Sequence, residues 1–118
     1  MEYDLNINNR AFKAIKEGNK KIEIRVTTEE SNFSYNILKK ADIIYFVNDL
    51  NEKIKCTVND IRWYPTIEDL LRYEGTVYTL SSTNDFNEGV KSINSIKGYK
   101  EGIKNNGVYA IEINYNIF

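Results

Sequence analysis

Apolar and polar residues alternate along several short stretches of the chain, and this alternation is typical of half-buried β-strands. It predicts strands over residues 3–7, 22–26, 53–59 and 108–113, with the third of these running on towards Tyr64. The uninterrupted apolar run at residues 43–47 predicts one more strand, buried on both faces. The polar stretch 48–51 then reads as the turn of a hairpin.

Apolar residues at helical spacing predict helices in the segments between these strands. The first helix follows a cap at Asn8 or Asn9 and ends before Gly18. The second opens at Thr66, which with Asp69 resembles a capping box. Further helices are predicted over residues 85–96 and 99–105, with a short helical piece near 35–39 and an extended link at 76–80.

Strands therefore lie at both ends and in the middle of the chain, with helices inserted between them. This order predicts one α+β domain over residues 1–118, with a mostly antiparallel sheet that can close into a β-barrel. A chain of 118 residues is long enough to bury a core of that kind.

The amino-acid composition argues against several classes of protein and of functional site. Hydrophobic residues make up 42% of the chain and charged residues 28%, as in ordinary globular proteins, and the sequence has neither a long apolar run nor a signal-like N-terminus. We therefore expect a soluble cytoplasmic protein with no membrane contact. The chain has no histidine and one cysteine, which argues against a structural metal, a disulfide and histidine catalysis. We expect no bound cofactor. Cys56 shares the parity of apolar Ile54 and Val58, so we expect a buried thiol.

Charge is unevenly distributed although the net charge is only −1. Basic residues exceed acidic ones in residues 10–26 and again in residues 90–104. Two basic surfaces would favour a nucleic-acid or nucleotide ligand. Scattered, solvated lysines explain the same pattern equally well, and the sequence leaves both interpretations open.

The stretch Gly18-Asn19-Lys20-Lys21-Ile22-Glu23-Ile24-Arg25 places several charges at the start of a strand. Arg25 is suited to a two-point contact with a phosphate or a base edge, and Lys20 to a phosphate. Glu23 can orient Arg25 or accept a hydrogen bond from an exocyclic amine. A competing interpretation is an ordinary Glu23–Arg25 pair on a solvated strand face, which would be weak and common.

Four motifs, in order along nearly the whole chain, resemble those of ASCH domains, which are similar to the PUA superfamily of RNA-binding β-barrels. They are the G-x-K-x-x-E-x-R pattern from Gly18 to Arg25, residues 39–46, residues 64–71, and Tyr99 followed by 107–111. One departure is Ala41, where the family usually has glycine. The resemblance implies a PUA-like barrel that binds RNA or a nucleotide-like small molecule in a cleft beside the first motif.

The resemblance also implies a set of site residues. It points to Lys20, Glu23 and Arg25 as ligand contacts, with Lys21 and Lys100 as peripheral phosphate contacts. Tyr99 is the aromatic residue that we expect to stack on an unpaired base.

An enzymatic function is also implied by the same family. Some ASCH proteins are amidohydrolases of N4-acetylcytidine, in which the motif supplies a lysine and a threonine nucleophile, and a glutamate follows later. Here Lys20 matches, Glu23 stands where the threonine would be, and Glu74 is the candidate for the later acid. The sequence is compatible as well with a ribonuclease that uses Lys20 and Tyr99 as acid and base, and with a protein-interaction module that leaves the cleft unused.

Overall fold

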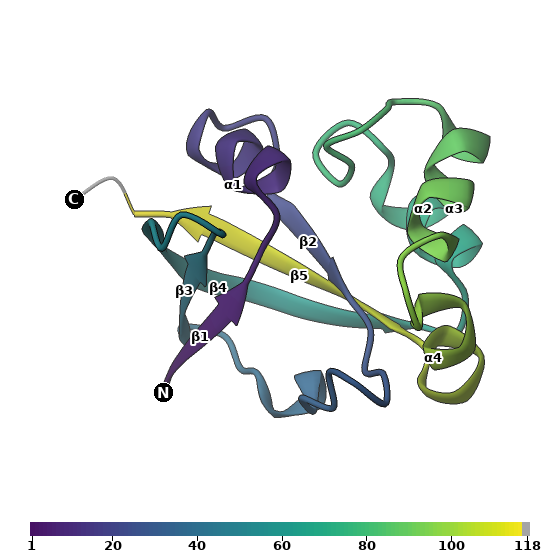
Figure 1. Ribbon diagram of the computed structural model, residues 1–118, viewed down its shortest axis with the longest axis horizontal. Helices are drawn as coiled ribbons and strands as arrows, with labels where there is room; N and C mark the ends of the chain where they lie inside the picture. The colour runs from purple at the N-terminus through teal and green to yellow at the C-terminus, as the bar shows by residue number, and fades with distance from the viewer. Residues whose placement is uncertain (117–118) are drawn as a thin grey trace.

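The computed structural model of the protein describes residues 1–116 (Figure 1). Their elements are β1 (Glu2–Asn6), α1 (Asn9–Lys16), β2 (Ile22–Arg25), the 3₁₀ turn η1 (Tyr35–Ile37), β3 (Ile43–Val47), β4 (Lys53–Tyr64), α2 (Ile67–Glu74), α3 (Phe86–Asn94), α4 (Tyr99–Asn106) and β5 (Val108–Tyr115). The predicted α+β class, strands and helices are confirmed. The extended link predicted at 76–80 is wrong, because this segment folds into turns.

The strands form one sheet in the order β1-β3-β4-β5-β2. β1 and β3 are parallel and the other three pairs are antiparallel, so the prediction of a mostly antiparallel sheet is confirmed. A closed barrel is not confirmed, since β1 and β2 form no ladder with each other among the described residues. The reason lies in the segment after α2. The Tyr78 carbonyl accepts hydrogen bonds from the amides of Lys21 and Ile22 and so occupies the start of the free edge of β2.

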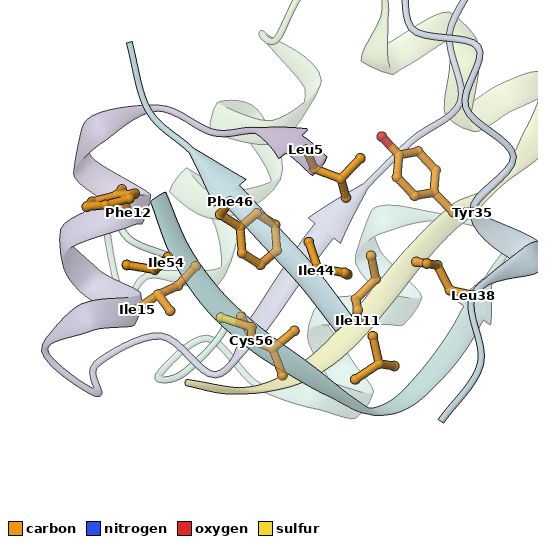
Figure 2. Packing of buried hydrophobic residues seen from close by; sticks show 12 residues of the cluster. Leu5, Phe12, Ile15, Tyr35, Leu38, Ile44, Phe46, Ile54, Cys56 and Ile111 are labelled. Carbon is orange, nitrogen blue, oxygen red and sulfur yellow. The ribbon is translucent and has the colours of Figure 1, made fainter. Parts of the chain in front are cut away.

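Two hydrophobic clusters form on the two faces of this sheet. The first lies inside its curve and includes Phe12 and Ile15 of α1 with Phe46 and Ile111 (Figure 2). The second lies between the opposite face and helices α2 to α4, and it contains Ile22, Ile24, Val26, Leu70, Leu71, Val108 and Ala110. Figure 1 shows these three helices gathered at one end of the sheet, away from α1. Because side chains alternate along a strand, Ile22 and Ile24 of β2 face the second cluster, whereas Glu23 and Arg25 face the first.

Side chains at the helix starts explain why the helices begin where they do. The side-chain oxygen of Asn8 accepts from the Ala11 amide at 2.8 Å, and the Thr66 hydroxyl accepts from the Asp69 amide at 3.1 Å. Asp85 accepts from the amide of Glu88 in the same way. Each cap satisfies an amide that has no partner within its helix. None of the helices in residues 1–116 has the length and apolar composition needed to cross a bilayer.

Cys56 is fully buried in the first cluster, as predicted. Burial, reinforced by the negative charge of Glu23, raises the pKa of its thiol to about 12. The thiol therefore stays protonated at neutral pH and packs as a small hydrophobic side chain.

Ala41 adopts a left-handed backbone conformation, with φ at 77°. This conformation costs a residue with a Cβ roughly 1–2 kcal/mol, whereas glycine adopts it freely. We expect Ala41→Gly to raise the free energy of unfolding by about 1 kcal/mol, measured by chemical denaturation. Ala14→Gly in α1 is the control and is expected to lower it by about 1 kcal/mol. A loss of stability in both variants would contradict this account of Ala41.

Candidate functional site

A cavity of about 230 Å³ lies at the opening of the sheet, between the end of β1 and the middle of β2. The turn between α2 and α3 and the start of α4 close it on the other sides. Its polar and charged lining residues are Asn6, Asn8, Arg10, Lys20, Glu23, Arg25, Thr79, Ser81, Ser82 and Tyr99. The gap between β1 and β2, where the sheet does not close, is therefore lined by residues of the first motif.

Lys20 lies at the inner end of this cavity, with only 5% of the residue exposed. Its ammonium group donates to the carbonyl oxygens of Ile22 at 2.7 Å and Thr79 at 2.6 Å, and lies 3.3 Å from Glu23 Oε1. Burial lowers the pKa of Lys20, and the charge of Glu23 opposes that shift. Lys20 thus joins the free edge of β2 to the turn that covers it.

Glu23 pairs with Ile111 across the sheet and shares its face, which is the inner one. The residue is 7% exposed, and its Oε2 accepts from Arg25 Nε at 2.9 Å. Burial alone would raise the pKa of Glu23, but the charges of Arg25 and Lys20 outweigh it and hold the pKa below its usual value. The expected Glu23–Arg25 pair therefore exists, but the interpretation that places it on a solvated strand face is wrong.

Arg25 spans the opening of the sheet. Its Nη2 donates to the Asn6 carbonyl at the end of β1 at 2.6 Å, and the guanidinium lies 5.8 Å from the ring centre of Phe46. Nε and Nη2 of Arg25 contact Glu23 and Asn6, and the Tyr35 hydroxyl also interacts with the guanidinium. Only 12% of the side chain is exposed, so the guanidinium lies in a largely desolvated position.

Tyr99, the first residue of α4, lines the same cavity and is half-buried. Burial raises the pKa of its hydroxyl to about 12, although the positive charge of Arg25 acts in the opposite direction. The hydroxyl is therefore protonated at neutral pH. The structure thus brings together four of the residues suggested by the sequence, namely Lys20, Glu23, Arg25 and Tyr99.

Lys21 and Lys100 lie elsewhere. Lys21 is exposed, and its ammonium lies 4.7 Å from the ring centre of Tyr78, in a second hollow that Lys20 and Glu112 also line. Lys100 is exposed on α4 and borders a third hollow beside Thr66. A ligand confined to the cavity at Arg25 would not need either lysine.

Glu74 lies on the opposite face of the sheet from Glu23. It accepts from Arg62 Nε at 2.6 Å and from the Tyr64 hydroxyl, and Arg62 pairs across the sheet with Ala110 of the second cluster. Burial alone would raise the pKa of Glu74, but the hydrogen bonds from Arg62 and Tyr64 outweigh burial and hold the pKa below its usual value. The geometry therefore gives no support to a hydrolytic scheme that uses both Lys20 and Glu74.

Other lining residues lie outside the four motifs. Arg10 at the start of α1 donates from Nε to the Ser81 hydroxyl at 3.3 Å, across 71 positions of the chain. Thr79 is fully buried, and its hydroxyl has no hydrogen-bond partner among the described residues. The only signal for this turn was the group of small hydroxyl residues Thr79, Ser81, Ser82 and Thr83. Within residues 1–116, no cluster of three potential metal ligands is present.

Comparisons with known proteins agree with the motifs. The model of the ASCH domain family matches residues 5–116. The crystal structure of hypothetical protein PH0355 superposes with a TM-score of 0.81 at 30% identity, over 98% of this chain and 100% of that one. The solution NMR structure of protein PF0455 from Pyrococcus furiosus superposes with a TM-score of 0.75 at 28% identity, over 100% of both chains. None of the curated proteins matches this chain.

Proposed function

Because this chain belongs to the ASCH domain family, we propose that the cavity between β1 and β2 binds single-stranded RNA or a nucleotide-like small molecule. The charge of the cavity supports this most directly. Its charged lining residues are Arg10, Lys20 and Arg25 against a single carboxylate, that of Glu23. Such a lining favours an anionic ligand, and the phosphates of RNA meet that requirement.

The contacts within the cavity suggest different roles for the motif residues. Lys20 is saturated by two carbonyl groups and Glu23, so it positions the floor of the cavity. Glu23 holds Lys20 and Arg25 in place. Arg25, whose guanidinium borders the cavity, is the residue that contacts the ligand, and Tyr99 offers a ring on which a base can stack.

The size of the cavity also fits this proposal. Ligand sites for drug-sized molecules usually enclose about 300–1,000 Å³. The cavity here is smaller, at about 230 Å³, so at most one unstacked nucleotide of a single strand would enter it. A double helix could not place a base there without releasing it from its stack.

An amide NMR titration with a short single-stranded RNA tests the proposal. We expect shifts at Arg10, Arg25 and Tyr99, and an affinity that falls steeply between low and physiological salt. Arg25→Gln is expected to weaken binding about tenfold or more, because it removes a charge-assisted contact.

Two further variants complete that experiment. Arg10→Gln alters an exposed side chain at the mouth of the cavity and is expected to weaken binding without disturbing the buried ion cluster. Lys100→Gln removes one positive charge outside the cavity and is expected to change the affinity little. Shifts centred on Lys21 or Lys100, or no shifts at either salt concentration, would contradict the proposed function.

A further inference from the structure

One part of the cavity wall is formed by the first turn of α1 and by the turn between α2 and α3. Asn8, Arg10 and Ala11 line the cavity from α1, and Ser81 lines it from the turn. The side-chain oxygen of Asn8 caps the Ala11 amide. The amides of Asn9 and Arg10 have no hydrogen-bond partner in the described part of the chain, and the first turn of α1 contains no acidic residue. This wall therefore combines the positive end of a helix dipole with unpaired N–H groups, which favour an anion.

Arg10 adds a positive charge without a counter-charge to the same wall. Its Nε donates to the Ser81 hydroxyl at 3.3 Å, which joins α1 to the turn. Within residues 1–116, Nη1 and Nη2 of Arg10 make no hydrogen bond, and no acidic residue forms an ion pair with Arg10. Lys20 and Arg25, in contrast, both contact the carboxylate of Glu23. The uncompensated charge of the cavity is therefore concentrated at Arg10, whose planar guanidinium is suited to a two-point contact with a phosphate.

Thr79, two residues before Ser81, gives an independent indication of a ligand at the turn. The residue is fully buried and lines the cavity, and its hydroxyl has no hydrogen-bond partner among the residues that the structure describes. The large majority of buried side-chain polar atoms have such a partner. The Thr79 carbonyl does have one, since it accepts from Lys20 at 2.6 Å and so holds the turn in place. The free hydroxyl therefore points to a polar ligand atom at this wall.

The small volume of the cavity bears on the kind of phosphate that fits. A cavity of about 230 Å³ admits at most one nucleotide, so an internal nucleotide of a strand would need room for both of its neighbours to leave. A nucleotide at the end of a strand has one neighbour, and a free nucleotide has none. A phosphate monoester also carries about −1.5 to −2 charges and three free oxygens at neutral pH, against one charge and two free oxygens on a diester. The unpaired donors around Arg10 therefore suit a monoester better.

We infer that the first turn of α1, Arg10 and Ser81 form a subsite for a terminal phosphate monoester, carried by a mononucleotide or by the end of an RNA strand. This inference rests on the proposed function and orients its ligand. The phosphate lies at α1, and the base lies towards Tyr99 and Arg25. Lys20 and Glu23 hold the inner part of the cavity and do not contact the phosphate.

Isothermal titration with three small probes tests the subsite. The probes are uridine, uridine 5′-monophosphate and the methyl ester of that monophosphate, which share one base and differ in their phosphate. We expect the monophosphate to bind at least about tenfold more tightly than uridine and several-fold more tightly than the methyl ester, because each of these loses charge-assisted contacts. The amide resonances of Asn9 and Arg10 should move with the monophosphate and much less with uridine.

Three variants locate the effect of the phosphate. Arg10→Gln is expected to reduce the preference for the monophosphate over uridine. Tyr99→Leu removes the ring at the base and is expected to weaken both probes by a similar factor, so that the preference stays. Lys13→Gln removes one exposed charge of α1 outside the cavity and is the matched control, expected to leave both affinities nearly unchanged. Equal effects of Arg10→Gln and Lys13→Gln, or a full preference in Arg10→Gln, would overturn the subsite.

A tetrauridylate with and without a 5′-phosphate separates the two sources of a monoester. Tighter binding of the phosphorylated strand than of the monophosphate would assign the subsite to strand ends, and the reverse order to free nucleotides.

The outcomes also separate this inference from the proposed function. Equal affinities for all probes with and without a phosphate, with shifts at Arg25 and Tyr99, would overturn the phosphate subsite and leave the proposed function standing. Absence of shifts at Arg10, Arg25 and Tyr99 with every probe and with RNA would overturn both.

Discussion

Glu23→Gln is expected to lower the free energy of unfolding by about 3–5 kcal/mol, because it leaves two buried cations without their counter-charge. Lys20 is 5% exposed and lies 3.3 Å from Glu23, and Arg25 lies 2.8 Å from it. Glutamine keeps the shape of the side chain, so the loss of stability would come from the missing charge and not from a change in side-chain volume. Thermal unfolding should show a melting temperature lower by more than about 10 °C.

Glu112→Gln on the neighbouring strand is the matched control. Glu112 contacts Arg62 at 3.0 Å, but its side chain is 39% exposed, and Arg62 keeps Glu74 and Asp60 as partners. Exposed pairs of this kind contribute about 0–1 kcal/mol. Equal losses in Glu112→Gln and Glu23→Gln would contradict a stabilising role for the buried cluster.

The same cluster makes stability depend on pH. The folded-state pKa of Glu23 lies below its usual value of 4.5, so its contribution is fully present above about pH 4.5 and is lost as the pH falls through the lower, folded-state value. Glutamine does not titrate. The difference in unfolding free energy between the wild type and Glu23→Gln should therefore be constant between pH 5 and 7 and shrink on further acidification. A constant difference down to the acid transition would show that Glu23 is not the group concerned.

Gly102→Ala is expected to lower the free energy of unfolding by about 1–3 kcal/mol and also to weaken nucleotide binding. Gly102 lies in α4 where the helix meets the end of β2, and an added Cβ would approach the Thr27 carbonyl oxygen at 2.7 Å and Val26 Cγ1 at 2.8 Å. A backbone carbonyl cannot rotate aside, so α4 has to move. Tyr99 begins this helix and lines the cavity, so the shift would move its ring.

Gly89→Ala separates this contact from a general effect of alanine in a helix. Gly89 lies within α3, and its added Cβ would meet Leu80 Cδ1, the mobile end of a side chain. Helix propensity favours alanine by about 0.5–1 kcal/mol at both positions. We expect Gly89→Ala to cost less stability and to leave the Tyr99 resonances nearly unchanged. If it disturbs Tyr99 as much as Gly102→Ala does, the close packing at Gly102 is not the cause.

Local patterns in the sequence accounted for most of the secondary structure. Caps at Asn8 and Thr66 and the alternation in β2 and β5 depend on neighbouring residues, and sequence reasoning captures such features directly. The open sheet was not foreseen, because it depends on the Tyr78 carbonyl, which lies more than 50 residues from its partner Ile22. Periodicity carries no information on contacts at that separation.

The same holds for the candidate site: the sequence identified residues of local motifs, but not the contacts that the fold creates between distant residues. The motif identified Lys20, Glu23 and Arg25, but alternation alone could not tell which face of β2 is buried, since both faces prove to be covered. Lys21 and Lys100, which the resemblance suggested as peripheral phosphate contacts, border other hollows, and their contact with a ligand stays a prediction. Arg10 and Thr79 belong to no motif, and only the fold brings them to the cavity.

The position of β5 has a consequence for how the protein is made. β5 lies between β4 and β2, so residues 22–25, near the start of the chain, find their strand partner only in residues 109–112. During synthesis, Lys20 and Glu23 emerge from the ribosome long before the strand that buries them. Pairings this distant in sequence form slowly and late. We therefore expect the nascent chain to have no binding cavity until β5 has emerged from the ribosome and paired with β2.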